Sequence, residues 1–576
     1  MKKQLLFLFA LCMVAMCYSQ TFTASDNNGN TLEFDITSAT TVRIIDYISG
    51  GTDLDIPTVV TYNSSTYSVT RIDNTALAAN NLTSVILPDG LLYIGNYAFE
   101  DNQLTNIIIP NGVTFIGEQA FSNNNLTNVV LSNSLDDIDD FAFENNQLTS
   151  ITIPSNVTDI GYAVFEGNPL STIISEATTP PTIVTGGVNS DSFNNNRSTI
   201  NLVIPNATTA AYTIVSGALW TGFKMIFEVT STTPNEVKVT DYNSASGSNV
   251  TIPATVADGS TVYSVTEIGQ NAFQSKSLTA ITLPNSIVTI GSHAFSGNQI
   301  TSLSLIPNSV TTIGQQSFQN NQITNIVIPN GVTHIEEAAF ANNLLTTIDI
   351  ADSVTFIGEA AFLGNNITDL NDVVLPVGLT TLPQQFLANN QLTSVTIPNT
   401  ITSIGERAFQ SNLLTNVTIP NSVTSIGDRA FNSNPLSDVY SEAITPPTII
   451  TGGGLDTFAA DRSTIHLHIP SGTMGVYVTD AGALWTGFNP VTEDASLSIN
   501  NHEFLNIVRV IQTDGFIKII SSDNIELNNY KLYNISGQKI ATDKNTEIKT
   551  ETLTSGVYIL KLNFYNKILT KKIIVN

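Results

Sequence analysis

The chain has 576 residues, of which 48 are acidic and 21 basic, so its formal net charge at pH 7 is −27. This excess of negative charge leaves no cationic footprint for phosphate groups, so nucleic acid is excluded as a partner. Only 12% of the residues are charged, about half the usual fraction, which argues against charged coiled coils and polyelectrolyte-type disordered chains.

The first nineteen residues have the layout of a secretory signal peptide. Lys2 and Lys3 precede an apolar run at residues 5–15, and small residues follow it. The apolar run is too short to cross a bilayer comfortably. We therefore predict a signal peptide at residues 1–19, cleaved between Ser19 and Gln20. No later segment approaches 18 uninterrupted apolar residues, so we expect no transmembrane segment in the mature chain.

Cleavage at this position would remove both cysteines, Cys12 and Cys17. The mature chain would then hold no disulfide and no cysteine-ligated metal. The alternative is a lipoprotein signal that acylates Cys17, and it is disfavoured because Met16 stands where a small residue is needed.

The body of the chain is an internal repeat of about 22 residues. In the first array, units begin at leucines spaced 22 apart, and phenylalanines keep the same spacing. A second array begins at Leu278 and contains seven units, two of them slightly longer than the others. The leucines of the first array are Leu82, Leu104, Leu126 and Leu148, and Leu170 follows at the same interval.

Each unit carries apolar residues at its first, fourth and sixth positions, which is typical of a short strand facing a core. A single unit cannot bury its apolar face alone, so stacking is required. At about 4.8 Å per stacked strand, four units would span roughly 19 Å and seven roughly 34 Å. An asparagine two residues before each start, such as Asn146 or Asn412, is predicted to form a buried structural ladder, because its amide can satisfy backbone groups of its own and a neighbouring coil.

These units resemble the BspA-like leucine-rich repeats of bacterial surface proteins, as in LTSVTIPNTITSIGERAFQSN at 392–412. The flanking segments agree with this resemblance. TDLDIPTVVTYNSSTYSVTRI at 52–72 and its counterpart at 248–268 resemble the opening hairpin of the family. GALWTGF at 217–223 recurs at 482–488 and resembles its capping segment. The chain is thus interpreted as a tandem duplication of opening hairpin, array and cap.

The last eighty residues differ from the body, because 497–576 hold ten basic and seven acidic side chains. Their short β-branched runs between turn residues predict a small antiparallel sandwich. LYNISGQKI at 532–540, LTSGVYIL at 553–560 and the lysines at 571 and 572 resemble the C-terminal sorting domain of type IX secretion substrates. That resemblance implies the type IX secretion machinery as a partner, and a secreted or outer-surface location in a Gram-negative bacterium. An ordinary terminal β-domain is the alternative.

The predicted fold class is mainly β, with two leucine-rich-repeat solenoid arrays that have opening hairpins and capping segments, followed by a small antiparallel β-sandwich. The predicted boundaries after the signal peptide are an opening β module at 20–81, a first array at 82–169, a first cap at 170–230, a second opening module at 231–277, a second array at 278–435, a second cap at 436–492 and the sorting domain at 497–576.

No catalytic constellation is visible in the sequence, so we expect no enzyme, no cofactor and no metal. His466 and His468 alternate with Leu467 on a predicted strand, but two ligands without a third are weak support for a metal, and surface histidines are the favoured interpretation. The acidic residues at 136, 137, 139 and 140 match no calcium-loop spacing, so a solvated acidic edge is favoured there.

The remaining functional candidate is the surface of the strands. Their second, third and fifth positions are mostly small and polar, so stacking would produce rows of hydroxyls and amides for an extended ligand. We predict binding of an extracellular protein or glycan, as in adhesion; the alternatives are a structural envelope spacer without a ligand and, more weakly, a polysaccharide-processing accessory protein. The residues of this candidate face are Thr149, Ser150, Thr152, Thr393, Ser394, Thr396, Thr415, Asn416 and Thr418.

Overall fold

The fold is taken from a computed structural model, which describes residues 20–185, 191–193, 197–215, 218–257, 261–303, 306–368, 373–376, 378–451, 456–458, 461–494, 497, 509–513, 515–520, 527–535, 537–551, 553–564 and 567–575. The predicted signal peptide, including Ser19, lies outside the described residues, whereas Gln20 is the first residue within them. The chain forms two compact units, Met1–Ala361 and Phe362–Asn576, and each is described by itself.

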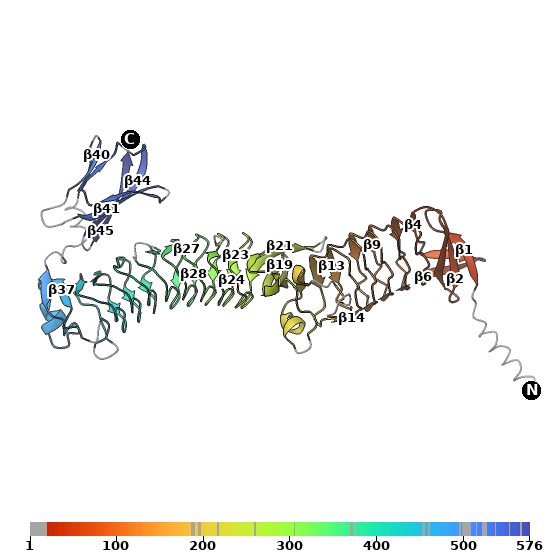
Figure 1. The fold of residues 1–576 in the computed structure, drawn as a ribbon, viewed down its shortest axis with the longest axis horizontal. Coiled ribbons are helices and arrows are strands. Elements are labelled where there is room, and N and C mark those ends of the chain that lie inside the picture. The colour runs from red at the N-terminus through yellow and green to blue at the C-terminus, as the bar shows by residue number, and fades with distance from the viewer. Residues whose placement is uncertain are drawn as a thin grey trace, which may run out of the picture. The chain divides into compact units, whose positions relative to one another are not determined.

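The first unit opens with antiparallel strands and continues as two ladders of short parallel strands (Figure 1). The opening strands are β1 (Thr21–Ser25), β2 (Thr31–Ile36), β3 (Thr41–Ser49), β5 (Val59–Tyr62) and β6 (Ser65–Ile72). One ladder runs in parallel from β6 through β8 (Tyr93–Ile94), β10 (Phe115–Ile116), β12 (Asp137–Ile138), β14 (Asp159–Ile160) and β16 (Thr182–Ile183).

The other strand of each repeat is β4 (Asp53–Asp55), β7 (Ser84–Ile86), β9 (Asn106–Ile108), β11 (Asn128–Val130), β13 (Ser150–Ile153), β15 (Thr172–Ser175) and β17 (Asn201–Ile204). Parallel pairing joins β4 to β7, β9 to β11, β13 to β15 and β15 to β17. Short helical turns η1 (Arg197–Thr199) and η2 (Ala210–Ile214) flank β17.

The antiparallel hairpin β18 (Met225–Thr232) and β19 (Asn235–Tyr242) continues the sheet of β17, and the repeat then resumes. The remaining elements of the first unit are η3 (Ser244–Ser246), β20 (Asn249–Thr251), β21 (Thr255–Ala257), β22 (Val262–Ile268), β23 (Ala280–Thr282), β24 (Thr289–Ile290), β25 (Ser302–Leu303), β26 (Thr312–Ile313), β27 (Asn325–Ile328), β28 (His334–Ile335), β29 (Thr347–Ile350) and β30 (Phe356–Ile357).

The second unit contains further repeat strands, a cap and a C-terminal antiparallel region. Its repeat and cap elements are β31 (Val373–Val374), β32 (Thr381–Leu382), β33 (Ser403–Ile404), β34 (Asn416–Ile419), β35 (Ser425–Ile426), β36 (Asp438–Ser441), β37 (His466–Pro470), η6 (Gly475–Thr479) and β38 (Val491–Asp494). The C-terminal strands are β39 (Arg509–Thr513), β40 (Phe516–Ile520), β41 (Leu527–Asn534), β42 (Lys539–Asp543), β43 (Glu547–Lys549), β44 (Gly556–Phe564) and β45 (Lys567–Val575).

The C-terminal strands form two antiparallel sheets, β39-β40-β43 and β42-β41-β44-β45. Ile517 of the first sheet and Leu532 and Leu560 of the second are fully buried in one shared core. The predicted fold class is therefore confirmed: mainly β repeat arrays with parallel sheets, followed by a small antiparallel region.

The apolar positions of each repeat form the core because alternate residues of a strand point to opposite faces. In the unit that starts at Leu104, this residue, Ile107 and Ile109 are buried. Between the two ladders the chain contains turns, as expected for an interval too short for a stable helix. Glycine in this interval permits close packing: at Gly95 a Cβ atom would lie 2.7 Å from the backbone nitrogen of Asn74.

Stacked phenylalanines form columns in the core of each unit. In the first unit, the ring centroids of Phe121 and Phe143 are 5.4 Å apart and those of Phe143 and Phe165 are 5.7 Å apart, with planes within 6° of parallel. The column continues through Phe193 to Trp220 of the cap. The ring centroids of Phe193 and Trp220 are 5.0 Å apart. This contact joins the core of the array to the core of its cap.

The asparagine ladder lies beside this column. Asn146 is fully buried, and its Nδ2 donates to the carbonyl oxygens of Phe121 at 2.9 Å and Phe143 at 3.1 Å. Its Oδ1 accepts from the backbone N–H of Leu126 at 3.0 Å. Asn146 therefore joins its own turn to the preceding one, as the sequence predicted, and Asn124 and Asn168 repeat this arrangement.

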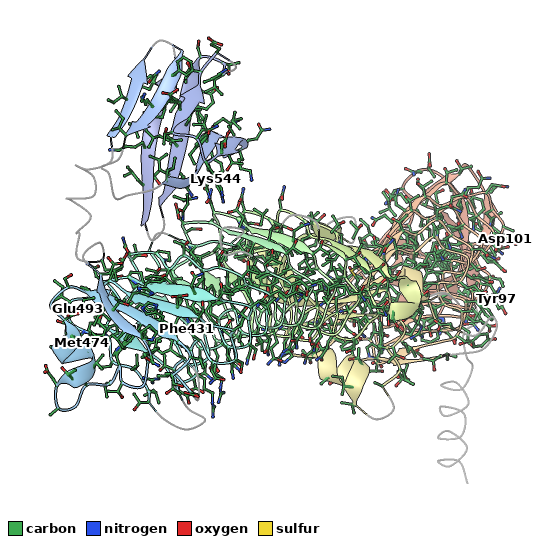
Figure 2. All side chains as sticks on the ribbon, turned by 60° about the vertical axis from the view of Figure 1, so that its left-hand side comes forward. Tyr97, Asp101, Phe431, Met474, Glu493 and Lys544 are labelled. Atoms are coloured by element: carbon green, nitrogen blue, oxygen red, sulfur yellow. The ribbon has the colours of Figure 1, made fainter. Side chains whose placement is uncertain are left out.

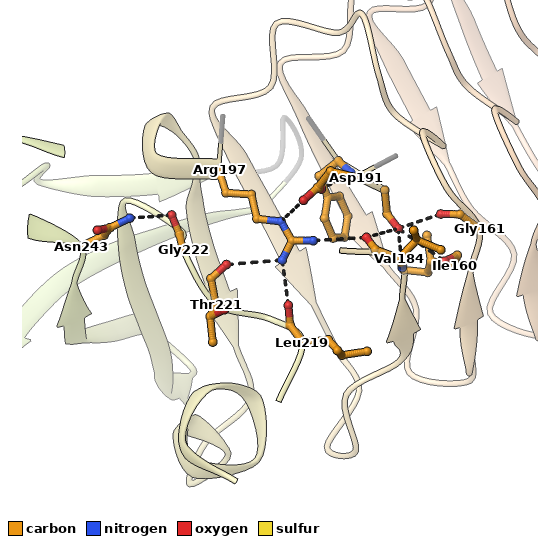
Figure 3. A network of polar contacts seen from close by, with 11 residues as sticks. Ile160, Gly161, Val184, Asp191, Arg197, Leu219, Thr221, Gly222 and Asn243 are labelled. Carbon is orange, nitrogen blue, oxygen red and sulfur yellow. Dashed lines mark hydrogen bonds and ion pairs between the residues drawn. The ribbon is translucent and has the colours of Figure 1, made fainter. Parts of the chain in front are cut away.

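Each cap is held by a buried arginine that the sequence reasoning did not single out. Arg197 Nε donates to Asp191 Oδ2 at 2.6 Å, and its Nη1 donates to the carbonyl oxygens of Leu219 and Thr221 (Figure 3). Arg462 makes the same set of contacts in the second unit, beginning with an ion pair to Asp456 at 2.7 Å. The planar guanidinium can donate in several directions at once. Arg197 can therefore join the segment that contains Asp191 to the segment that contains Leu219 and Thr221.

Candidate functional site

The outer face of the short strands in the first unit consists of repeated rows of side chains. In β7, β9 and β11 the middle residue is buried and its two neighbours are exposed. The parallel register pairs Asn128 with Asn106 and Val130 with Ile108. Side chains at equivalent positions in successive repeats therefore lie in register on one surface.

Three residues of the predicted ligand face lie on this surface of the first unit. Thr149 is exposed, and Ser150 and Thr152 in β13 are half-buried. Ser150 pairs with Thr172 of the next strand. The structure thus brings these three residues into one patch.

The other predicted residues lie on the corresponding surface of the second unit. They come from two successive repeats, which are directly bridged, with Thr396 beside Thr418. The same row continues from Thr418 to Tyr440 and then to His468. The exposed members of the predicted set are Thr393, Ser394, Thr396, Thr415 and Asn416, and Thr418 is half-buried.

Several hydroxyls of the face already bond to the framework. Thr127 Oγ1 donates to the carbonyl oxygen of Thr105 at 3.2 Å, one repeat earlier, and Thr393 Oγ1 donates to that of Thr368 at 3.2 Å. Asn416 Nδ2 in turn donates to Thr415 Oγ1 at 3.3 Å. In Thr127 and Thr393 these bonds occupy the only hydroxyl hydrogen, so a ligand would meet the acceptor lone pairs of those oxygens.

An exposed aliphatic row was missed by the sequence reasoning. Ile86, Ile108 and Val130 are 61%, 66% and 46% exposed and occupy the fifth position of successive repeats. The same position holds Thr152 in the following unit. Strand alternation turns the fifth position of each repeat outward. The isoleucines at 86 and 108 at this position are the sequence signal for the row.

The acidic residues of the third repeat support the local backbone. Asp139 Oδ1 accepts from the N–H of Asp140, and Asp140 Oδ1 accepts from the N–H of Tyr162, both at 2.9 Å. The pKa of the Asp137 carboxyl is raised above its ordinary value, mainly by burial. The neighbouring negative charges of Asp139, Asp159 and Asp136 raise it further.

His466 and His468 do point the same way, as their spacing predicted, and their ring centroids are 3.8 Å apart. A third residue joins them: Asp438 Oδ1 lies 3.1 Å from His468 Nε2. Burial and the neighbouring His468 lower the pKa of His466, against the opposing influence of Asp438. Sequence reasoning missed Asp438 because it lies 28 positions before His466 and meets it only through strand pairing.

Residues 70–199, 242–368 and 365–446 match the family model described as BspA type leucine-rich repeat region. These residues make up more than half of the chain. This chain belongs to the BspA-type leucine-rich repeat family. Its C-terminal residues 489–576 match the secretion system C-terminal sorting domain. This BspA-type chain is a leucine-rich repeat protein of the secreted or cell-surface class, and its last domain implies sorting by type IX secretion.

Several solved structures are similar to this BspA-type protein. A leucine-rich repeat protein from Bacteroides ovatus is 20% identical, with 76% of this chain and 98% of that chain covered and a TM-score of 0.25. A leucine rich cell surface protein from Faecalibacterium prausnitzii is 20% identical, with 73% and 94% covered and a TM-score of 0.20. The pneumococcal vaccine antigen PcpA is 15% identical, with 79% and 94% covered and a TM-score of 0.28.

A comparison with curated proteins found no match. Within the described ranges of this BspA-type chain, no helix has the length and apolarity needed to span a membrane.

Proposed function

We propose that this protein binds an extracellular protein through the outer faces of its repeat strands and so mediates adhesion at the cell surface. The observation that carries this proposal is the exposed row of Ile86, Ile108 and Val130, bordered by exposed threonine and asparagine side chains. Strand stacking repeats this pattern about every 4.8 Å, which suits an extended ligand that makes many similar contacts.

The aliphatic row favours a polypeptide over a glycan in the first unit. Complete burial of an isoleucine side chain contributes about 1.5–3 kcal/mol. Ile86 and Ile108 are each more than half exposed, so a covering ligand would gain roughly 1–2 kcal/mol from each of them. The polar rows of the second unit, such as Thr393 and Thr396, would add hydrogen bonds suited to either ligand class.

The test screens the mature protein against extracellular matrix proteins, glycans and whole cells. An Ile86→Asn/Ile108→Asn double variant is expected to lose at least about 30-fold in affinity for the bound protein. Ile214→Asn is the matched control, because Ile214 is 74% exposed and belongs to η2 instead of a repeat strand. Equal affinity of all three proteins would show that this face is not the contact surface, and the absence of any ligand would overturn adhesion.

A structural spacer without a ligand is the second candidate, and the hydroxyl bonds to the framework favour it. If the threonine rows serve the stack itself, deletion of the gene is expected to alter envelope integrity and leave attachment unchanged. Reduced attachment with an intact envelope would favour adhesion instead.

We also propose export by both ends of the chain, with a signal peptide at 1–19 and the sorting domain at 497–576, in a Gram-negative bacterium. Cell fractionation with mass spectrometry of the two ends tests this proposal. A surface or released protein that begins at Gln20 and lacks the C-terminal domain is expected. A periplasmic protein that retains this domain would contradict it.

A further inference from the structure

Three potential metal ligands meet on the outer face of the second unit. Asp438 begins β36, and His466 and His468 lie two residues apart in β37. The parallel register places Asp438 directly beside His466. Leu467 between the histidines is fully buried, so the alternation of the strand turns both imidazoles outward.

Their ligand atoms lie at separations compatible with a single ion. Asp438 Oδ1 is 3.1 Å from His468 Nε2 and 3.7 Å from His466 Nδ1. One ligand atom from each of the three residues lies within 4.8 Å of the other two. An ion held tetrahedrally at about 2.0–2.1 Å from each donor needs donor separations of about 3.3 Å, so small rotations of the side chains would suffice.

Neighbouring groups orient all three side chains. Thr492 Oγ1 contacts His466 Nε2, which leaves Nδ1 of that ring facing Asp438. The Tyr440 ring stacks on His468, with centroids 4.2 Å apart and planes 13° from parallel. Ser437 Oγ donates to Asp438 Oδ2 at 2.7 Å, so Oδ1 is the oxygen directed at the histidines. Such outer contacts set the ring orientation and tautomer of metal-bound histidines.

The first unit contains the same strands without these ligands. β15 and β17 pair in the equivalent register, with Thr172 beside Asn201 and Ile174 beside Val203. Both caps otherwise share a hydrogen bond between a serine hydroxyl and a tyrosine hydroxyl, Ser175 with Tyr212 in one and Ser441 with Tyr477 in the other. The cap fold therefore does not require histidine or aspartate at these positions, and the cluster needs another explanation.

Accessibility also differs between the two caps. Thr172 and Val203, the counterparts of Asp438 and His468, are buried, and Asn201, the counterpart of His466, is half-buried. The side chains of His466, Asp438 and His468 retain 30%, 31% and 16% exposure. An ion could thus reach the ligands in the second cap, and partial burial would strengthen its attraction to the carboxylate.

We propose that Asp438, His466 and His468 form a binding site for a divalent zinc-class metal ion. Imidazole nitrogens suit zinc, copper, iron and nickel, whereas calcium and magnesium prefer all-oxygen sites. Three protein ligands leave one tetrahedral position open to water or to a group of a bound partner. The ion would join β36 to β37, and the argument for this site does not depend on the proposed adhesive role.

The experiment uses the untagged mature chain, stripped of metal with a chelator. Zn²⁺ binding is measured by calorimetry, and Co²⁺ is used as a spectroscopic substitute whose visible absorption reports its ligands. One ion per chain is expected, with displacement of Co²⁺ by Zn²⁺. The unfolding midpoint should rise with Zn²⁺ concentration, because a ligand that binds only the folded state stabilises it.

The matched variant is Asp438→Thr/His466→Asn/His468→Val, which restores the residues of the first cap. It is expected to lose the site while the fluorescence of Trp485, in the same cap, stays native. His468→Val alone should weaken Zn²⁺ binding by about 100-fold or more, and Thr492→Val, which alters a positioning residue, by about tenfold.

His334→Gln is the control, because His334 is an exposed histidine in the first unit whose ring bonds to Thr333. It should bind Zn²⁺ like the unmodified protein. The proposal is wrong if the unmodified protein shows no saturable Zn²⁺ or Co²⁺ binding, or if the triple variant binds equally well.

Discussion

Replacement of Asn146 by alanine tests whether the buried amide ladder holds the stack together. The substitution removes the Asn146 Oδ1 atom that accepts the Leu126 N–H at 3.0 Å. The carbonyl oxygens of Phe121 and Phe143 lose one donor each but keep another, from Asn124 and Asn168 respectively. The Glu144 carbonyl oxygen, 3.2 Å from Asn146 Nδ2, also loses a donor but keeps the N–H of Asn123. The damage is therefore one orphaned donor and the loss of the two amide N–H groups that these three carbonyl oxygens share.

The magnitude follows from these losses. An orphaned buried N–H costs about 1–3 kcal/mol, and each further lost hydrogen bond about 1 kcal/mol. Asn146→Ala should therefore lower the free energy of unfolding by about 3–5 kcal/mol. At a slope of about 2–3 kcal/mol per molar urea, the midpoint would fall by between about 1 and 2.5 M.

The nearly isosteric Asn146→Asp variant separates hydrogen bonding from packing. It keeps the shape but presents carboxylate oxygens to two carbonyl oxygens in a buried site, so it should be less stable than the alanine variant. Burial would raise the pKa of the new carboxyl, because the neutral form is favoured there. Its stability should then recover as pH falls, since the protonated group can donate again.

The assay is urea unfolding followed by the fluorescence of Trp220, in a Trp485→Phe background shared by all variants. Trp220 reports the first array because the phenylalanine column reaches it. Asn106→Ala is the control, because this amide is exposed and bonds to Thr105; its effect should stay within about 0.5 kcal/mol. A loss below about 1 kcal/mol for both Asn146 variants would refute the ladder as a stabilising element.

Three further predictions concern the core and the first cap. Phe143→Ala should lower the free energy of unfolding by about 3–5 kcal/mol and Phe143→Leu by less, measured in the same urea assay, because the ring is fully buried within the stacked column. Asp191→Asn should lower it by about 3–5 kcal/mol by leaving Arg197 buried without its counter-charge, whereas an effect below about 1 kcal/mol would show that the carbonyl contacts suffice. Burial raises the pKa of the Tyr212 hydroxyl to about 12 from its usual 10. The neutral hydroxyl therefore contributes about 2–3 kcal/mol to the free energy of unfolding below pH 10, and this contribution is lost as pH rises towards 12. Tyr212→Phe should reduce this alkaline loss of stability, which is measured by tyrosinate absorbance and by unfolding at each pH.

The periodicity alone determined the repeat fold. Apolar residues at fixed positions, such as Leu104, Ile107 and Ile109, can be buried only if successive units stack. The asparagine ladder was predictable for the same reason, because an amide repeated beside the core needs backbone partners. The outward position of Ser150 and Thr152, on either side of the buried Ile151, followed from the alternation of the strand.

Other features depend on contacts between distant residues. Tyr97 adopts a left-handed backbone conformation with φ of 61°, which is unfavourable for an aromatic residue. Its N–H donates to the Glu118 carbonyl oxygen of the next turn at 2.7 Å, and Asp101, which Figure 2 also labels, repeats this arrangement. Stacking supplies the bonds that hold these conformations, and local sequence preference does not reveal them.

The metal-ligand cluster shows the same division. The spacing of His466 and His468 predicted two side chains on one face of a strand, and this was correct. The third ligand, Asp438, is supplied by the parallel pairing of β36 with β37. β36 and β37 are far apart along the chain, so only the tertiary structure could bring the carboxylate within 3.1 Å of an imidazole. Sequence periodicity determines which face a residue occupies, whereas strand register decides which residues meet on it.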